Sequence, residues 1–574
     1  MKVLQAASGF TEAKDIPIID FLTSEGLEAE LLYDDSGFYK AIPRAGLIND
    51  GTFMPSFLER CIPYLNDKKR ITKPLKRNGS DFVEISFSEA FDIIEKAIKQ
   101  VNPNENAFFA GARLSNEALY LIQKFARAGV KSNNIGSFHY LGRNATHYNI
   151  DKNDNVQFSE IENCTSIVLL GTAVKEKSGM AWQMMNSYNL PCYFIVEKDK
   201  IPPFGRNDDA LLGIRGGSSS GNKAAAASAS CLLQSPSFRP KGGIYETTNY
   251  YHFIKALNHH IITNNLQQGI FVEELVKEQF LKYKEQLLAE DFESLLEKAG
   301  ISASEISEFA DFYLKDKRCV IVFSEQDVTS HTVRELLNLC LLTGKSGFPS
   351  SGILSLKEKN NAQGLFDMGI FSHIGIGGNI FNNAFIQIMK NVWKTTHIAT
   401  EIIDNEEYLC SGKSKNLFIF GEDPLGCIRN QVKNDLSNII VQSIDNAHFI
   451  MVQDYFLTET ALKADLILPD TFPFETGGSF TNTIKIVQSF TEVIPSPVEI
   501  NNLQQLSSLC QRFGLSPCNT LDDIFLEMIT FLKTECSGGS RHQFVYTQKD
   551  SNMPLFNAGC DDLMKKSMIS KIHF

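Results

Sequence analysis

The sequence predicts an α/β protein built from doubly wound parallel sheets. Short apolar runs that end in Gly, Asp or Pro recur along its 574 residues, and amphipathic helical patterns lie between them. Such runs are typical of strands buried on both faces of a parallel sheet. Strands that alternate with helices imply right-handed βαβ units. At roughly 100–200 residues per domain, the chain should form three or four lobes.

Six apolar runs are the expected strands. They are residues 166–171, 192–196, 319–323, 416–421, 448–454 and 464–469. Ligands of open α/β sheets bind beyond the carboxyl ends of the strands, so the turns that follow these runs are the first places to look for a site.

The helical patterns between the strands carry start and stop signals. Ser86 and Glu89 fit a capping box at the start of one helix. Two further helices should end at Gly129 and Gly344, because glycine accepts the left-handed conformation that closes a helix. Residues 252–300 also look helical and charged.

Composition and charge exclude several classes of protein. The hydrophobic fraction of 43% and the charged fraction of 21% are ordinary globular values. A net charge of −12 argues against a nucleic-acid partner, since phosphate binding needs clustered Lys and Arg. No signal peptide and no run of about 20 apolar residues is visible. We therefore expect a cytoplasmic protein without direct membrane insertion.

The twelve cysteines are widely spaced, and the two nearest neighbours are Cys510 and Cys518. Iron–sulfur and zinc sites usually take at least two ligands from one short loop, as in C-x-x-C. We therefore expect isolated buried thiols and no iron–sulfur cluster. Residues 216–243, rich in Gly, Ser and Ala, are expected to form a flexible loop, although their amides could instead line an anion.

Several predicted turns contain distinctive sequence motifs, which follow one another in a definite order along the chain. They are 70–75, Asp327-Val-Thr-Ser-His331, 341–347, Lys359-Asn-Asn-Ala-Gln-Gly364 with its continuation to 369, Gly421-Glu-Asp-Pro424, 452–461, 464–469 and Glu475-Thr-Gly-Gly-Ser-Phe-Thr-Asn-Thr483 with Gln488. In this order the motifs strongly resemble the molybdopterin oxidoreductase family, and its formate dehydrogenase-like members in particular. The resemblance spans about residues 45–200 and 305–535.

The resemblance implies a small N-terminal β lobe and two α/β lobes that face each other across a cleft. The expected divisions are a vestigial iron–sulfur lobe at 1–70, a discontinuous first α/β lobe at 71–145 and 370–535, a second, inserted lobe at 146–369 with the 216–243 loop, and a tail at 536–574 in place of the family's β-barrel cap. In the family, each α/β lobe binds one pterin guanine dinucleotide.

The resemblance also implies which residues would contact a pterin dinucleotide if one is bound. They are Gly171, Thr172, Asn360, Asn361, Gln363, Gly364, Gly421, Glu422, Asp465, Thr481 and Asn482. Amides beside a flexible glycine suit the hydrogen-bonding groups of a heterocycle, and Asp465 or Asp470 could accept from a guanine or ribose group. The alternative is that these polar residues only cap helices and turns, as we expect of Thr458.

Residues that the family uses for redox chemistry are missing. The first sixty residues contain no cysteine, and Met54 and Ser56 stand where the family has its fourth cluster cysteine and a lysine. A thioether and a hydroxyl cannot replace thiolates. The metal ligand should fall near Gly142, where neither Gly142 nor Arg143 can serve, and we interpret Ser137 and His139 as turn or packing residues.

The resemblance, together with the missing cluster cysteines and the missing metal ligand, predicts a noncatalytic molybdopterin oxidoreductase-like subunit of a respiratory NADH:quinone oxidoreductase (complex I) or a related electron-transfer assembly. Its partners would be protein subunits at the cytoplasmic face of the inner membrane. We predict no catalytic residue, no metal and no cofactor, with molybdopterin guanine dinucleotide as the alternative occupant. One alternative function is an active molybdopterin-dependent enzyme of formate dehydrogenase type with unusual metal ligation. Another is a stand-alone protein that binds a nucleotide-like ligand.

Overall fold

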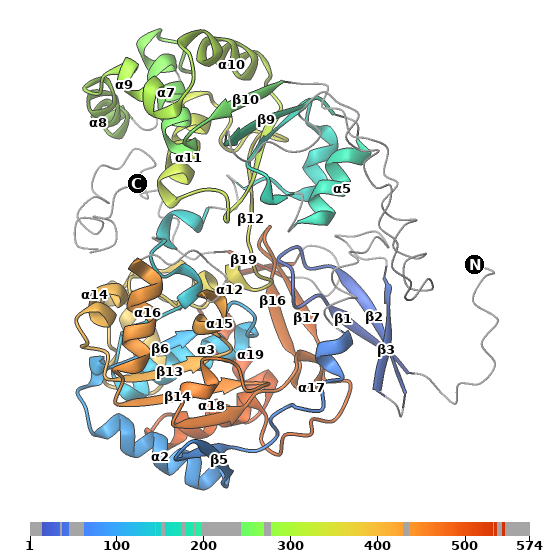
Figure 1. Cartoon of the computed structure of the whole chain (residues 1–574), viewed down its shortest axis with the longest axis vertical. Helices are drawn as coiled ribbons and strands as arrows, with labels where there is room; N and C mark the ends of the chain where they lie inside the picture. Colours follow the sequence, from blue (N-terminus) through green and yellow to red (C-terminus); the bar gives the residue numbers. More distant parts are fainter. Residues whose placement is uncertain are drawn as a thin grey trace, which may run out of the picture. The chain divides into compact units, whose positions relative to one another are not determined.

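The computed structural model of the chain describes residues 14–34, 37–44, 62–143, 145–150, 155–174, 178–188, 190–197, 243–268, 277–428, 435–531, 533–536 and 542–545. The chain divides into two compact units (Figure 1). Unit 1 is Met1–Asn149 with Lys357–Phe574, and unit 2 is Ile150–Leu356. The chain is thus a mixed α/β protein in which one unit is inserted into the other, as the sequence predicts for its fold class.

A seven-stranded sheet forms the centre of unit 1 (Figure 1). Its order is β5 (Asp81–Glu84), β4 (Leu75–Asn78), β15 (Leu466–Pro469), β14 (Phe449–Asp454), β13 (Asn416–Phe420), β6 (Asn106–Ala110) and β7 (Ile135–Gly136). The last five strands are parallel, and β4 and β5 form an antiparallel edge. Every residue of β6 and β13 is buried, because helices cover both faces of the sheet.

The helices of unit 1 begin where the sequence places their caps. Ser86 accepts a hydrogen bond from the Glu89 N–H (3.2 Å) at the start of α2. The bounds are α2 (Phe87–Lys99), α3 (Asn116–Lys124), α12 (Ala362–Asp367), α13 (Asn383–Val392), α14 (Asn405–Cys410), α15 (Pro424–Ile428), α16 (Asp435–Asp445), α17 (Pro473–Thr476), α18 (Asn502–Arg512) and α19 (Leu521–Ile529). Thr458 caps a short 3₁₀ turn, since its hydroxyl accepts the Ala461 N–H at 3.2 Å.

The helix that we expected to end at Gly129 ends two residues later. A π-helical turn, Phe125–Val130, follows α3, and Lys131 takes the left-handed conformation (φ 64°) that closes it. The wide turn inserts residues that a regular helical count does not allow for, so the end signal at Gly129 was wrong.

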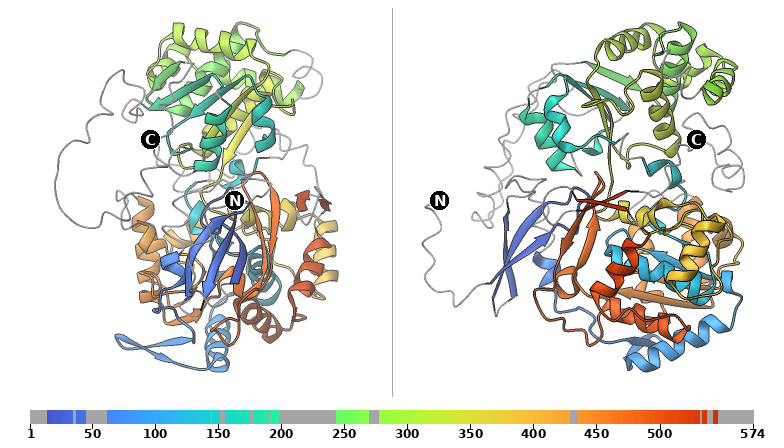
Figure 2. Two further views of the ribbon diagram at one scale, coloured as in Figure 1. Left: turned by 90° about the vertical axis from the view of Figure 1, so that its right-hand side faces the viewer. Right: turned by 180° about the vertical axis from the view of Figure 1, so that it is seen from behind.

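Two antiparallel sheets complete unit 1, and Figure 2 shows the first of them beside β16 and β17. The first contains β1 (Lys14–Ile19), β2 (Glu28–Asp34) and β3 (Gly37–Pro43), and the second β16 (Gly478–Thr481), β17 (Ile486–Phe490), β19 (His542–Val545) and β18 (Lys533–Cys536). One apolar cluster packs the first sheet against Phe472, Phe474, Phe480 and Phe490. Met54, Ser56 and Cys61 lie outside the described residues.

The expected tail at 536–574 is not wholly loose. Its residues His542–Val545 form β19, which pairs with β17 and β18. The edge of β17 offers unpaired backbone groups, and a strand from the tail satisfies them. The rest of the expected tail beyond residue 545 lies outside the described residues.

Unit 2 is built on a five-stranded parallel sheet. Its order is β10 (Ile244–Thr247), β9 (Cys192–Glu197), β8 (Ser166–Leu170), β11 (Cys319–Ser324) and β12 (Gly352–Leu356). Its helices are α5 (Gly179–Ser187), α7 (Tyr250–Thr263), α8 (Lys277–Leu288), α9 (Phe292–Ala299), α10 (Ala303–Lys315) and α11 (Ser330–Leu342). Residues 216–242 of the predicted loop lie outside the described residues.

Residues 357–369 belong to unit 1, whereas we expected them in the inserted lobe. The Asn361 N–H donates to the Ala112 carbonyl (2.9 Å), and the Lys357 N–H donates to the Thr483 hydroxyl (2.9 Å). These bonds fix the segment against strands and turns of unit 1.

The described cysteines are not all buried. Cys164, Cys192, Cys319, Cys340, Cys510 and Cys518 are buried, as expected, but Cys410 and Cys427 are exposed. The two exposed cysteines belong to the short surface helices α14 and α15. No helix in the described part of the chain combines the length and the apolar character needed to span a bilayer.

Candidate functional site

The carboxyl ends of four parallel strands meet at one edge of the unit 1 sheet. Phe420 of β13 pairs with Ala110 of β6 and with Gln453 of β14. The turns that follow β6 and β13 approach so closely that an added Cβ on Gly111 would lie 2.1 Å from the Gly421 carbonyl oxygen. Only glycine allows this backbone contact, so Gly111 and Gly421 place the two turns side by side.

Glu422 ties the turn after β13 to the loop after β7. Its carboxylate accepts from the Ser137 hydroxyl (2.6 Å), the Phe138 N–H (3.0 Å) and the His139 N–H (3.2 Å). Burial raises the pKa of Glu422 to about 7, against the opposing effect of these hydrogen bonds. Glu422 therefore positions the 137–139 loop with its own acceptor oxygens.

The expected position of the metal ligand holds no donor side chain. Gly142 donates its N–H to Glu406, and the Arg143 guanidinium forms an ion pair with Glu358 at 3.0 Å. Ser137 donates its hydroxyl to Glu422. These contacts confirm the structural role that we predicted for Ser137.

His139 differs from Ser137, because part of its side chain is unused. Only 7% of that side chain is exposed, and its Nε2 has no hydrogen-bond partner among the described residues. Burial lowers the pKa of His139 well below the ordinary value, and the nearby cations Arg143, Lys359 and Arg113 lower it further. The imidazole is therefore neutral at physiological pH and can still donate or accept one hydrogen bond.

Arg113 and Lys359 form a pair of cations that the sequence analysis missed. Arg113 follows β6, and Lys359 directly precedes Asn360. Neither side chain has a hydrogen bond or an ion pair to any described residue. Burial and then Arg113 lower the pKa of Lys359, while Glu358 and Glu422 act in the opposite direction. The signal in the sequence was a cation next to each strand-end motif.

Asn360 and its neighbour Asn361 are both buried but have opposite roles. Neither polar atom of the Asn360 amide has a partner among the described residues. By contrast, the Asn361 amide donates to the Leu114 carbonyl (2.7 Å) and accepts from the Thr481 N–H (2.7 Å). Asn361 therefore holds the framework, and the Asn360 amide remains available to a ligand.

Other predicted site residues also have hydrogen bonds or close contacts within the protein itself. Gln363 donates to Asn149 (3.1 Å) and Asp367 (2.9 Å). An added Cβ on Gly364 would lie 2.3 Å from the Asn361 Oδ1, so only glycine fits there. Asn482 accepts from the N–H groups of Ile484 (3.2 Å) and Ile486 (2.9 Å), and Thr481 accepts from the Asn116 amide (3.1 Å).

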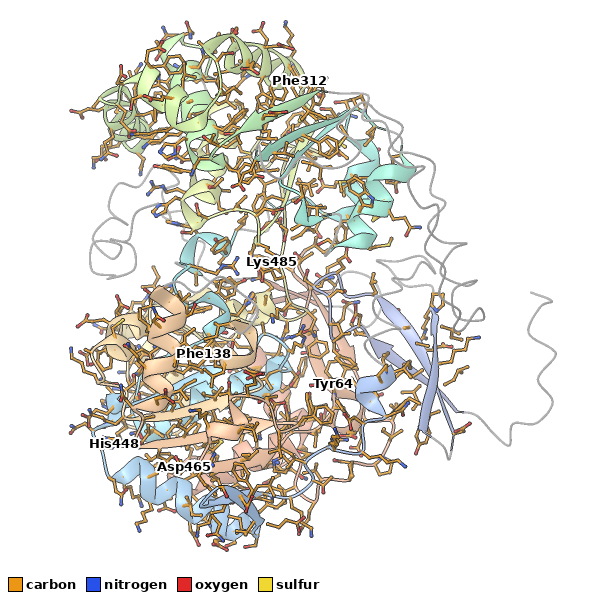
Figure 3. All side chains as sticks on the ribbon, viewed as in Figure 1. Tyr64, Phe138, Phe312, His448, Asp465 and Lys485 are labelled. Atoms are coloured by element: carbon orange, nitrogen blue, oxygen red, sulfur yellow. The ribbon has the colours of Figure 1, made fainter. Side chains whose placement is uncertain are left out.

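Asp465 lies at the wrong end of its strand for a ligand at this edge. It precedes β15, and its carboxylate accepts from the Ile450 N–H at the start of β14 (2.8 Å). Figure 3 shows Asp465 near His448, which likewise precedes its strand. The expectation that Asp465 sits with Gly421 and Glu422 was therefore wrong, whereas Asp470 does follow β15.

In unit 2, Gly171 and Thr172 follow β8, as predicted. The Gly171 turn (φ +88°) is filled by Asp327, whose Oδ2 lies 2.2 Å from an ideal Cβ and accepts from the Ala173 N–H at 2.7 Å. An internal carboxylate thus takes the place at the strand end where an anionic ligand group would bind.

An α/β protein with a polar, cationic site at the carboxyl ends of its parallel strands is of the ligand-binding doubly wound class. The molybdopterin oxidoreductase family profile matches residues 70–200 and 247–511, and the chain belongs to this family. It is 28% identical over 492 residues to the F420-dependent formate dehydrogenase subunit alpha of Methanocaldococcus jannaschii, and 26% identical over 463 residues to a putative formate dehydrogenase of Staphylococcus aureus. These alignments cover 82% and 75% of the chain.

The chain matches only part of each relative, namely 66% of the archaeal protein and 42% of the staphylococcal one. Among solved structures, acetylene hydratase from Pelobacter acetylenicus aligns with a TM-score of 0.61 at 15% identity, covering 89% of the chain and 70% of that structure. This structural similarity shows that the two proteins share a fold.

Proposed function

We propose that the chain is a formate dehydrogenase-like, noncatalytic subunit that binds an anionic ligand at the strand-end site of unit 1. The observation that carries the proposal is the presence of two cations, Arg113 and Lys359, that form no ion pair with a described residue and that both act on the pKa of His139. The carboxyl groups in electrostatic reach are Glu358 and Glu422 for Lys359 and Asp20 for Arg113. Two unpaired cations near each other repel a metal cation and attract a carboxylate or phosphate.

The Asn360 amide adds hydrogen-bonding capacity to the same site. A buried amide without partners costs about 1–3 kcal/mol, and a ligand that pairs with it offsets this cost. Asn360 adjoins Lys359 in the chain, so one ligand can use both the charge and the amide. An anion that also carries hydrogen-bonding groups therefore fits better than a simple halide.

The residues present do not fit the family's metal. Thiolate, hydroxyl or carboxylate ligation would have to come from the 137–143 loop, where Ser137 is bonded to Glu422 and Gly142 has no side chain. For a pterin dinucleotide, Asn360 and the cation pair fit an anionic or heterocyclic part in unit 1, while Asp327 opposes an anion in unit 2. We therefore derive no redox step for this chain.

The second candidate is an active molybdopterin-dependent enzyme of formate dehydrogenase type. It is favoured by the names of the relatives, which are formate dehydrogenases. The more specific expectation of a complex I subunit rests on the lost ligands alone and gains no support from these relatives, so the proposal does not extend to that complex.

The test of the anion site is a calorimetric titration of the purified chain with formate and with inorganic phosphate. We expect saturable binding that weakens at least about tenfold in the Arg113→Gln and Lys359→Gln variants, because each loses one of the two charges. The Lys463→Gln variant, which removes an exposed lysine paired with Asp445, is the control and should bind as the wild type does. Equal binding by all four proteins would contradict the proposal.

A further inference from the structure

A buried lysine of unit 1 contacts the sulfur of a buried cysteine. Lys124 is the last residue of α3, and its side chain is fully buried. Its Nζ donates to the Cys518 Sγ at 3.6 Å and to the Ser516 carbonyl at 3.3 Å. Cys518 is buried in the loop between α18 and α19. The contact therefore joins two segments that are far apart in the sequence.

Glu527 of α19 adds a carboxylate to this contact. It accepts from the Lys124 Nζ (2.7 Å) and from the Tyr120 hydroxyl (2.9 Å). The Tyr120 hydroxyl in turn accepts from the Trp393 Nε1 at 2.8 Å, so the carboxylate is held in place. Since 21% of the Glu527 side chain is exposed, the carboxylate can pass protons between the buried groups and solvent.

The loop also holds the thiol of Cys518 in position. The Cys518 N–H donates to the Ser507 hydroxyl of α18 at 3.0 Å. Burial raises the pKa of the Cys518 thiol to about 11, although Lys124 acts in the opposite direction. The thiol is therefore protonated at neutral pH, and such thiols react slowly with oxidants. What distinguishes Cys518 is its direct contact with an amine that lies beside a proton acceptor.

We propose that Lys124 and Cys518 form a covalent N–O–S bridge when a peroxide oxidises the folded protein. One oxygen atom then joins the lysine Nζ to the cysteine Sγ. A bridge with an inserted oxygen spans most of the observed 3.6 Å, whereas a direct S–N bond requires the two atoms to approach much more closely. The inference goes beyond the proposed function, because it uses none of the residues of the anion site.

Two molecules of hydrogen peroxide are the oxidant. The first converts the thiol to a sulfenic acid: an S–O bond forms, the O–O bond breaks and one water is released. The second converts the amine to a hydroxylamine and releases another water, after the ammonium proton has passed through Glu527 to solvent. The hydroxylamine oxygen then attacks the sulfenic sulfur, the bond from that sulfur to its hydroxyl breaks, and a third water leaves.

The bridge fastens the end of α3 to the loop between α18 and α19, and a thiol reductant reverses it. Four thiol groups supply the four electrons that return the amine and the cysteine, with release of one water and formation of two disulfides. The site is thus a reversible oxidative modification of unit 1.

Lys345 of unit 2 is a matched control. It is buried as Lys124 is. Burial lowers the pKa of Lys345, and the thiols of Cys319 and Cys340 act against this effect. Its Nζ, however, donates to the Asp316 carbonyl and forms no hydrogen bond to a cysteine sulfur in the described part of the chain. A bridge that needs direct contact should form at Lys124 and not at Lys345.

The experiment treats the folded chain with hydrogen peroxide and identifies the products by tryptic digestion and mass spectrometry. We expect the peptides that contain Lys124 and Cys518 to be linked, with a gain of one oxygen and a loss of two hydrogens, and with no cleavage after Lys124. Dithiothreitol should restore both free peptides, and the peptide of Lys345 should stay unlinked. Because Arg512 separates Cys510 from Cys518, trypsin places the two cysteines on different peptides and also reveals any disulfide between them.

Several results would overturn the proposal. They are a disulfide between Cys510 and Cys518, a Lys124–Cys518 link without the extra oxygen, oxidation of Cys518 to sulfinic acid with no link, and an equal yield of links at Lys345. The same treatment of the urea-unfolded chain should give no bridge, because the contact depends on the fold. A bridge formed there in equal yield would also count against the proposal.

Two variants test the roles of the neighbouring groups. Cys510→Ser should still form the bridge, because Cys510 takes no part in it, and loss of the bridge in this variant would contradict the proposal. Glu527→Gln should slow bridge formation at least about tenfold, because it removes the proton acceptor beside the amine. An unchanged rate in Glu527→Gln would contradict the proton path.

Discussion

Asn360 and Asn361 provide a test of how the strand-end site is built, because adjacent buried amides have opposite hydrogen-bonding states. Asn361→Ala removes the donor to the Leu114 carbonyl and the acceptor of the Thr481 N–H. Asn360→Ala removes an amide with no partner among the described residues. The substitutions delete the same atoms, so the difference between them reports the hydrogen bonds.

The expected magnitudes follow from the groups left behind. Asn361→Ala leaves two buried backbone groups unpaired, at about 1–3 kcal/mol each, so the free energy of unfolding should fall by about 2–6 kcal/mol. Asn360→Ala removes an unfavourable unpaired amide and leaves a small cavity, two effects of opposite sign. Its net effect should stay within about 1 kcal/mol.

Urea unfolding followed by tryptophan fluorescence measures this difference. The chain has two tryptophans, and Trp393 is fully buried in unit 1, whereas Trp182 belongs to α5 of unit 2. In a Trp182→Phe background, Trp393 therefore reports the unfolding of unit 1 alone, which avoids mixing two transitions. Equal destabilisation by the two substitutions would refute the assignment of Asn360 as an unused amide.

Three further predictions concern the same edge of the sheet. Burial raises the pKa of both Asp454 and Asp470 to about 7, so the native state binds more protons than the unfolded state above about pH 4. The free energy of unfolding of unit 1 should therefore fall as the pH rises from about 5 to 8. An Asp470→Asn variant should show a shallower fall. A free energy of unfolding that rises over this pH range would contradict the prediction. Gly111→Ala should cost about 2 kcal/mol or more in a urea titration, because the added Cβ meets the Gly421 carbonyl, and a cost near zero would contradict the close approach. Glu422→Ala should speed amide hydrogen exchange in the 137–139 loop more than Glu422→Gln, which keeps an acceptor oxygen; equal exchange would count against this anchoring role.

The strands could be predicted because burial on both faces of a sheet favours a continuous run of apolar residues in the sequence. Asn416–Phe420 is buried on both faces and therefore reads as a continuous apolar run. The error at Asp465 has a physical origin as well. An acidic residue beside an apolar run marks a strand end, but it marks a carboxyl end only when it follows the run, and Asp465 precedes it.

The composition of the site could not be predicted in the same way. Arg113 and Lys359 come from segments that are far apart in the chain, and only the register of β6 and β13 with the 357–364 segment brings them together. Asn360 and Asn361 have identical side chains, so the sequence cannot tell which amide is used by the framework. These distinctions depend on tertiary contacts, which local patterns do not encode.

Metal analysis of the natively purified chain, combined with formate-dependent dye reduction, tests the central claim of a noncatalytic, anion-binding subunit most directly. We expect no stoichiometric molybdenum, tungsten or iron and no formate-dependent reduction, because the 137–143 loop holds no cysteine or carboxylate and its Ser137 hydroxyl is hydrogen-bonded to Glu422. Turnover that follows the bound molybdenum or tungsten content, and that is lost in a Ser137→Ala variant which still folds, would contradict the account and establish the active formate dehydrogenase-type enzyme instead.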